Sequence, residues 1–486
     1  MNTIKLAKGV THLMLPFRLG SGWSLNTTNI EDDIWTKTDE DIHRLDFLLE
    51  HVSEFFTKNY QPGKEDESAC IIMKLKKEAL PVKMFNNKKQ WLSNKSFDNQ
   101  KKSGKLFRFP VYIDPNSFRI VCHPFTSVAV LLFSVELIKA DNNIDLSTLA
   151  DFIQMNYLLR LFNRHDEVFL ISQNERPEER KKAQLLLTDG NPDKFENTDN
   201  LNIEHSGWRP GQLINYLLSG LNRRYKVEFF NHFHFTPVSY LQPVNEIIDE
   251  EKIHKALFYL RKVYDFDYTP ASGILQSREE LLNPYRQIYY AASLEGAVVI
   301  NNSGSSDPEF LKTFYSGSFQ KTFWLAILGF LQRSIFLQLM KELSDIDTND
   351  HQMVKEYLGR YTTISLKALF SKVSIYHQHN DFYDMIIHNL QINELQTELK
   401  DELYGLNNLQ RQFHEDEVEK HEEIEKQYDK KLNMILFALS VFSLTQVTYA
   451  VMSNKSLSLF QHSLAIGIPV FLGLLFWQIL SSRKNR

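Results

Sequence analysis

The sequence predicts an α/β domain, then a long α-helical stalk, then two C-terminal transmembrane helices, in a chain that assembles as an oligomer. Apolar runs at residues 432–452 and 459–480 are each close to the roughly 20 residues that a helix needs to cross a bilayer. Residues 381–431 contain no proline and only one glycine, Gly405, as expected of one long helix. Over residues 1–300, short strand-like runs alternate with helical patterns.

These patterns divide the chain into four predicted parts. They are a cytoplasmic α/β sensor domain at 1–300, a helical subdomain at 301–380, a stalk helix at 381–431 and a two-helix transmembrane hairpin at 432–482. The expected elements of the first two parts are strands at 10–16, 128–138, 226–236 and 296–300, helices at 40–56, 145–162 and 210–224, a hairpin at 106–122, and a helix ending near residue 343.

Two further stretches of the soluble part have a specific expectation. Residues 83–106 are polar and basic, which is typical of an exposed loop. Residues 323–330 are apolar, but Gln332 and Arg333 interrupt the run soon afterwards. This pattern favours a buried core helix over a third membrane span.

The composition excludes several classes of protein. The chain has 486 residues, of which 43% are hydrophobic and 24% charged, and its mean hydropathy is −0.33, so it is not a many-span transporter. Because the net charge is only −5, we expect no direct binding of nucleic acid. The two cysteines, Cys70 and Cys122, are far apart and lack a C-x-x-C partner, which indicates reduced thiols in a cytoplasmic compartment.

The stalk shows one apolar helix face that gives way to charge. Leucines and one phenylalanine recur at steps of three and four, at Leu395, Leu399, Leu403, Leu406, Leu409 and Phe413. Charged residues dominate 414–431, with opposite charges four apart at Asp416/Lys420 and Glu422/Lys426. An unbroken helix of ~50 residues would be ~75 Å long. The charged part is then either a solvated helix or an acidic ring that concentrates cations at a pore mouth.

Basic residues orient the predicted hairpin. Lys430 and Lys431 precede the first span and three basic residues follow the second, whereas the short loop between them holds only Lys455. By the positive-inside rule, both termini lie in the cytoplasm and the hairpin lies in the inner (cytoplasmic) membrane, with the lipid bilayer as its partner. Two spans cannot enclose a water-filled path alone, so conduction requires an oligomer.

This layout resembles the CorA family of divalent-cation transporters: a cytoplasmic α/β domain, a very long helix entering the first span, a tight loop, a second span and a basic tail. The resemblance covers roughly residues 370–486, and residues 373–409 are placed like that family's stalk. The family's Gly-Met-Asn signature ends its first span. Here the same place reads Tyr449-Ala-Val-Met-Ser-Asn454, which lacks the glycine and has an intervening serine.

The resemblance implies a homopentamer whose first spans line the pore, with a divalent cation as the transported ion. Members of this superfamily associated with type III CRISPR antiviral defence are opened by an adenylate-type nucleotide second messenger, and the absent signature places this chain nearer to that branch. The first span itself carries polar residues that suit a pore wall or, equally well, hydrogen bonds between packed helices. The candidate pore-lining residues are Asn433, Ser440, Ser443, Gln446 and Asn454.

One cluster in the soluble part has the composition of a nucleotide site. Arginine forks suit phosphate, and histidine or tryptophan stacks on a base. The candidate ligand-binding residues are Arg223, Arg224, His232, His234, Trp208 and Arg209. The alternative is an ordinary pair of sheet histidines beside surface arginines. His377, His379 and Asp381 lack a further metal ligand and predict a hydrogen-bonded turn, so no metal site is expected.

Three functions remain open from the sequence. No phosphate-binding loop, dinucleotide fingerprint, zincin motif or nucleophile elbow occurs, so we expect no enzyme and no resident cofactor. The favoured hypothesis is a CorA-like channel that a small nucleotide opens. The alternatives are a constitutive divalent-cation transporter and a tail-anchored scaffold that conducts nothing.

Overall fold

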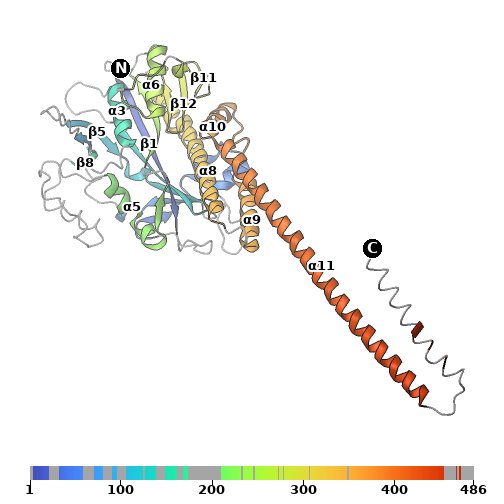
Figure 1. Ribbon diagram of the computed structural model, residues 1–486. Helices are drawn as coiled ribbons and strands as arrows, with labels where there is room; N and C mark the ends of the chain where they lie inside the picture. Colours follow the sequence, from blue (N-terminus) through green and yellow to red (C-terminus); the bar gives the residue numbers. More distant parts are fainter. Residues whose placement is uncertain are drawn as a thin grey trace, which may run out of the picture. The chain divides into compact units, whose positions relative to one another are not determined.

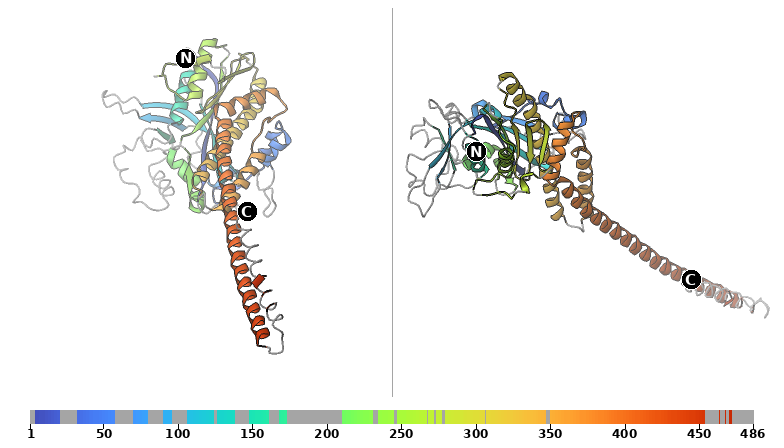
Figure 2. Two further views of the ribbon diagram at one scale, coloured as in Figure 1. Left: turned by 45° about the vertical axis from the view of Figure 1, so that its right-hand side comes forward. Right: turned by 90° about the horizontal axis from the view of Figure 1, so that it is seen from above.

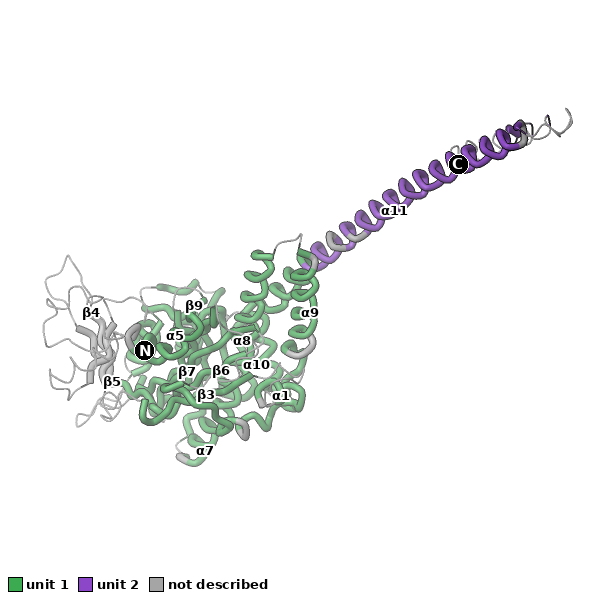
Figure 3. The backbone as a smooth tube through the Cα atoms, turned by 90° about the horizontal axis from the view of Figure 1, so that it is seen from below, with its two compact units in different colours: residues 1–402 green, residues 403–486 purple. Residues whose placement is uncertain are grey.

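The computed structural model describes residues 4–20, 32–57, 70–79, 90–95, 106–123, 126–137, 148–160, 168–172, 210–230, 234–244, 247–266, 268–271, 273–276, 279–305, 307–346 and 350–453, with residues 463, 467, 470 and 471 (Figure 1). The chain forms two compact units, residues 1–402 and 403–486 (Figure 3).

One mixed sheet organises the first unit. The order of its strands is β11-β12-β13-β10-β1-β7-β5-β4-β8. In addition, β9 pairs with β1, β6 pairs with β7, β3 pairs with β6, and β2 pairs with β3. The strands are β1 (Leu6–Leu19), β2 (Trp35–Lys37), β3 (Ile71–Leu75), β4 (Gln90–Lys95), β5 (Leu106–Ile113), β6 (Arg119–His123), β7 (Val128–Leu137), β8 (Val168–Ser172), β9 (Val227–Phe229), β10 (Thr236–Pro243), β11 (Leu281–Tyr285), β12 (Ile288–Ala292) and β13 (Ala297–Asn301). Among the described strands, β10 and β13 form the one parallel pair.

Helices cover both faces of this sheet, which makes the predicted α/β class correct in its broad sense (Figure 2). One face carries α3 (Leu149–Arg160), α5 (Pro210–Tyr225) and α6 (Glu250–Lys262), and the other carries α8 (Gln320–Ser344) and α10 (His377–Asn389). Since successive side chains of a strand point to opposite faces, β1 is apolar almost throughout because both of its faces are buried.

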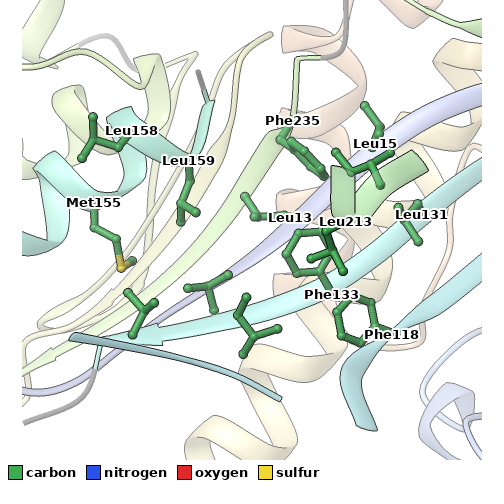
Figure 4. Close-up of a cluster of buried hydrophobic side chains, with 14 of the residues drawn as sticks. Leu13, Leu15, Phe118, Leu131, Phe133, Met155, Leu158, Leu159, Leu213 and Phe235 are labelled. Atoms are coloured by element: carbon green, nitrogen blue, oxygen red, sulfur yellow. The ribbon is translucent and has the colours of Figure 1, made fainter. Parts of the chain in front are cut away.

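Figure 4 shows the core on the α3 and α5 face. Leu13 and Leu15 of β1 lie there beside Leu131 and Phe133 of β7, and helical side chains cover them. The helical residues labelled in the figure are Met155, Leu158, Leu159 and Leu213. Residues of β1 that alternate with these leucines, such as His12, point instead toward α8.

In two places, two short strands pair with successive parts of one long strand, and this pairing differs from the predicted elements. The hairpin expected at 106–122 is wrong, because β5 and β6 pair with successive parts of β7 along one edge and not with each other. Likewise, the strand expected at 226–236 is replaced by β9 and β10, which pair with successive parts of β1. A long strand thus provides partners for two short ones in sequence.

Long-range pairing also accounts for two further corrections. The helix expected at 40–56 is divided into a 3-10 turn, η1 (Ile42–Leu45), and the shorter α1 (Glu50–Thr57). Between them, Leu48 bridges to Ser374 and the Leu49 N–H donates to the Val373 carbonyl, which holds the chain extended there. The loop expected at 83–106 contains β4, which pairs with β5 and β8.

The buried core helix expected around residues 323–330 is α8. It follows α7 (Pro308–Thr313) and a π-helical turn, η9 (Phe314–Phe319). The stretch Glu309–Ser344 is long and apolar enough to cross a membrane, yet 83% of its most apolar window is buried within the protein. Its apolar side chains therefore already have protein partners, as the interruption by polar residues predicts.

A close approach between α8 and α10 depends on Gly329. A Cβ atom at this position would collide with the Ile386 side chain of α10. We expect Gly329→Ala to lower the free energy of unfolding by about 1–3 kcal/mol through overpacking.

Gly359, in α9 (His351–Lys367), has open space around it and provides the matched control. The matched Gly359→Ala change should stabilise by about 1 kcal/mol, since alanine favours a helix. Urea unfolding of both variants measures the two effects, and effects of equal sign would contradict this packing.

The last described helix, α11, is one helix from Ile392 to Met452. It passes without interruption through the charged stretch and the first apolar run. The single helix expected over 381–431 is wrong in its first part, because α10 ends at Asn389 and Gln391, with a positive φ of 55°, separates it from α11. It is the second helix of the described chain that is long and apolar enough to cross a membrane, and none of its most apolar window is buried. Apart from residues 463, 467, 470 and 471, the predicted second span lies outside the described residues.

Candidate functional site

Only three of the six predicted ligand-binding residues are among the described residues. Arg223 and Arg224 lie on the last turn of α5, and both are exposed; the Arg223 Nε–H donates to the Ser219 carbonyl at 3.4 Å. His234 is exposed just before β10. The other members, Trp208, Arg209 and His232, lie outside the described residues. The structure thus places the two arginines on an open surface, and the cluster stays a prediction.

The predicted pore residues form part of α11. Asn433, Ser440, Ser443 and Gln446 are exposed on this helix in the single chain, and the Ser440 hydroxyl donates to the Leu436 carbonyl at 2.8 Å. Asn454 lies outside the described residues. Polar groups on an otherwise apolar helix need protein or water partners inside a bilayer.

A cleft that sequence reasoning missed opens on the α8 face of the sheet. Its volume is about 1040 Å³, and six separate segments line it. They are the chain around η1, the end of β3 with the lysines after it, the turn between β5 and β6, the middle of β1 and β7, and the π-helical turn η9 with the start of α8. No local motif marks such a site, because its residues come together only in the folded sheet.

Ion pairs organise one end of this cleft. Asp41, only 3% exposed, receives the Arg119 Nε–H at 2.6 Å and lies 3.2 Å from the Arg44 guanidinium. Lys74 pairs with the exposed carboxylate of Glu40. The Lys76 ammonium donates to the Asp32 carbonyl at 2.6 Å. Hydrogen bonding from Lys74 lowers the pKa of Glu40, so this carboxylate stays charged at neutral pH.

Carboxylates and tyrosines line the other end. Tyr112 of β5 lies directly opposite Glu136 of β7, and Asp114 follows two residues after Tyr112. Burial raises the pKa of Glu136, and the charge of Lys8 opposes this shift. The Lys8 ammonium lies 3.6 Å from the centre of the Tyr315 ring, a cation–π contact. This end is therefore acidic and aromatic.

His12 lies in the floor of the cleft. Its Nδ1 is 2.7 Å from the Ser134 hydroxyl, and its ring stacks on Phe323 at 4.2 Å between centroids. Its Nε2 is buried and has no hydrogen-bond partner among the described residues. Burial, with the nearby charges of Lys8 and Arg44, lowers the pKa of His12 to about 3. The imidazole is therefore neutral at physiological pH.

This burial predicts a pH dependence of stability. The unfolded chain takes up a proton at His12 near pH 6.5, whereas the folded chain resists it down to about pH 3. Stability is thus complete above pH 6.5 and falls with pH below it, by about 2 kcal/mol for this group between pH 6.5 and 5. In urea unfolding, His12→Gln should have a shallower dependence on pH. The control His377→Gln changes a fully solvated ring and should keep the wild-type slope; equal slopes in all three proteins would contradict the prediction.

Two other expectations concern groups outside the cleft. Cys70 and Cys122 are free, buried thiols, and burial raises the pKa of both. His379 is buried with its Nδ1 3.1 Å from the Ser374 hydroxyl, whereas His377 faces solvent 3.8 Å from Asp381. The turn expected at His377–Asp381 is instead the first turn of α10.

No protein-family model, curated protein or solved structure matches this chain.

Proposed function

We propose that this chain forms a CorA-like homo-oligomeric channel, with a pentamer as the expected assembly. Its soluble domain binds an adenylate-type nucleotide second messenger and gates an ion pore in the inner (cytoplasmic) membrane, with both termini in the cytoplasm. The biological setting that fits this activity is antiviral defence of the type III CRISPR kind.

The observation that carries the proposal is the continuity of α11. Its first residues belong to the compact α/β unit, where Leu399 is fully buried, and its last residues form the apolar span. A helix transmits movement along its axis because each backbone N–H after its first turn is bonded to the carbonyl four residues earlier. One continuous helix thus joins the proposed sensor to the proposed pore wall.

The exposed surface of the apolar run supports membrane insertion. Leu436, Leu439 and Phe442 are 50%, 57% and 63% exposed, and no part of the most apolar window of α11 is buried. A contiguous apolar surface of this kind marks a membrane or protein contact. Lipid and the equivalent spans of further subunits would together cover it.

The charged part of α11 supports passage of cations. Residues 415–425 hold seven acidic side chains against one lysine, and all of them are exposed. In a symmetric assembly each acidic position is repeated once per subunit. Such rings raise the local concentration of cations, and the effect decreases at high salt.

Ion flux tests the proposal. The purified full chain is reconstituted in liposomes, and efflux of K⁺ and Mg²⁺ is measured with and without ATP, AMP and cyclic or linear oligoadenylates. We expect flux that depends on at least one of these nucleotides. Flux that is independent of nucleotide but blocked by divalent ions would favour the constitutive transporter, and no flux under any condition would favour the scaffold.

A further inference from the structure

We propose that the cleft on the α8 face binds a bipolar small molecule of nucleotide size, with its anionic group at Arg44, Lys74 and Lys77 and an amino group at Glu136. The inference rests on the proposed function: it assigns the sensor's nucleotide ligand to this cleft, and it adds that this nucleotide carries a basic amine besides the adenine amino group. It differs from the sequence-based expectation, which places the ligand at Arg223 and Arg224.

The cleft has the size and the position of a small-molecule site. A volume of about 1040 Å³ is at the upper end of the range for small-molecule sites, which is roughly 300–1,000 Å³. The cleft lies within the compact unit of residues 1–402, against the start of α8. Strands from the centre of the sheet form its floor, so a bound molecule would contact rigid backbone.

Positive and negative side chains are distributed unequally along the lining of the cleft. Around η1 and β3, the cleft is lined by five cationic side chains, Arg44, Lys74, Lys76, Lys77 and Arg119, and by three carboxylates, Glu40, Asp41 and Glu78. Within this set, Asp41 pairs with both Arg119 and Arg44, and Lys74 pairs with the exposed Glu40. Arg44 is 51% exposed and Lys77 is exposed. An anionic group can therefore bind Arg44, Lys74 and Lys77 while buried Asp41 keeps its hydrogen bond from Arg119.

At the opposite end, Asp114 and Glu136 are lining carboxylates. Two basic side chains lie near them: Arg119 donates to the Asn116 carbonyl at 2.6 Å, and the Lys8 ammonium lies over the Tyr315 ring. Glu136 is half-buried and incompletely compensated, which is why its pKa is raised. A protonated amine in the cleft would supply the missing positive charge and a charge-assisted hydrogen bond.

His12 lies in the cleft between these two ends. It is 6% exposed, it lines the cleft, and its Nε2 has no hydrogen-bond partner among the described residues. A buried polar atom without a partner costs about 1–3 kcal/mol, and a ligand atom in hydrogen-bond contact would remove that cost. Tyr315 and Phe323 line the same space, so this part of the cleft is aromatic.

Calorimetric titration of the detergent-solubilised full chain tests this assignment with two probes, ATP and N6-(6-aminohexyl)-ATP. The second probe is the same nucleotide with a primary amine on a six-carbon linker at the adenine N6. We expect Lys74→Ala combined with Lys77→Ala to weaken both probes about tenfold or more. Glu136→Gln should remove the advantage of the amine-bearing probe and leave ATP affinity within about twofold.

The matched control removes the same charge elsewhere: Arg223→Ala combined with Arg224→Ala should leave both affinities unchanged. If that variant loses binding while the two lysine substitutions do not, the cleft assignment is overturned and nucleotide sensing stands. If neither probe binds the wild-type chain at millimolar concentration, both the assignment and nucleotide sensing fail. Equal affinities of the two probes for the wild type overturn the bipolar ligand.

Discussion

Glu423→Pro should abolish nucleotide-dependent ion flux while nucleotide affinity stays unchanged. Glu423 is an exposed residue in the middle of α11, outside both the cleft and the apolar run that begins at Leu432. Proline removes one backbone hydrogen bond and clashes with the preceding turn, which costs about 3 kcal/mol or more and kinks or breaks a helix. A broken α11 would no longer transmit movement from residues before the break to those after it.

Flux from liposomes and nucleotide titration on the same preparation measure the two halves of this prediction. Glu423→Ala removes the same carboxylate but keeps the helix, so it serves as the control and should behave like the wild type. If Glu423→Pro retains the full nucleotide response, signal transmission does not depend on an unbroken α11.

Ser440→Leu combined with Ser443→Leu should lower flux at least tenfold without loss of assembly. If these hydroxyls face the pore, two leucines per subunit narrow it and remove groups that hold water, and hydrophobic constrictions close pores by dewetting. The control is Thr445→Leu, a polar-to-apolar change at an exposed position of the same helix but on a different side.

Flux and the mass of the detergent-solubilised assembly are measured for both variants. Loss of assembly in the double variant would indicate that the hydroxyls hold packed helices together instead of lining a pore. Equal loss of flux in the double variant and in Thr445→Leu would show that polarity on this side of the helix has no special role.

Elements with a strong local pattern could be predicted from the sequence. The apolar runs of β1 and β7, the helix α5 that begins at Pro210, and the long proline-free α11 all occur where expected. In these segments, propensity and hydrophobic period agree with the tertiary structure. The errors arose where a distant partner decides the conformation: Ser374 holds Leu48 extended inside an expected helix, and β7 pairs with both halves of an expected hairpin.

The cleft could not be predicted for the same reason. Lys74 and Lys77 come from a short strand and turn that gave no motif, and Glu136 ends a strand that reads as plain core. His12 is a single histidine within an apolar run, which is usually a buried structural residue. Only the pairing of β1 with β7 brings it to Ser134, two residues from Glu136 on the same face.

In the proposed channel, nucleotide binding to the soluble domain and opening of the pore are two parts of one coupled equilibrium. A ligand can shift that equilibrium only through different affinities for the open and closed states. The most direct measurement is nucleotide occupancy and ion flux on the same proteoliposomes across a range of nucleotide concentrations. We predict that flux rises over the concentration range in which occupancy rises, and that any variant that weakens binding shifts both curves together. Flux that stays constant while occupancy goes from zero to saturation would contradict the account.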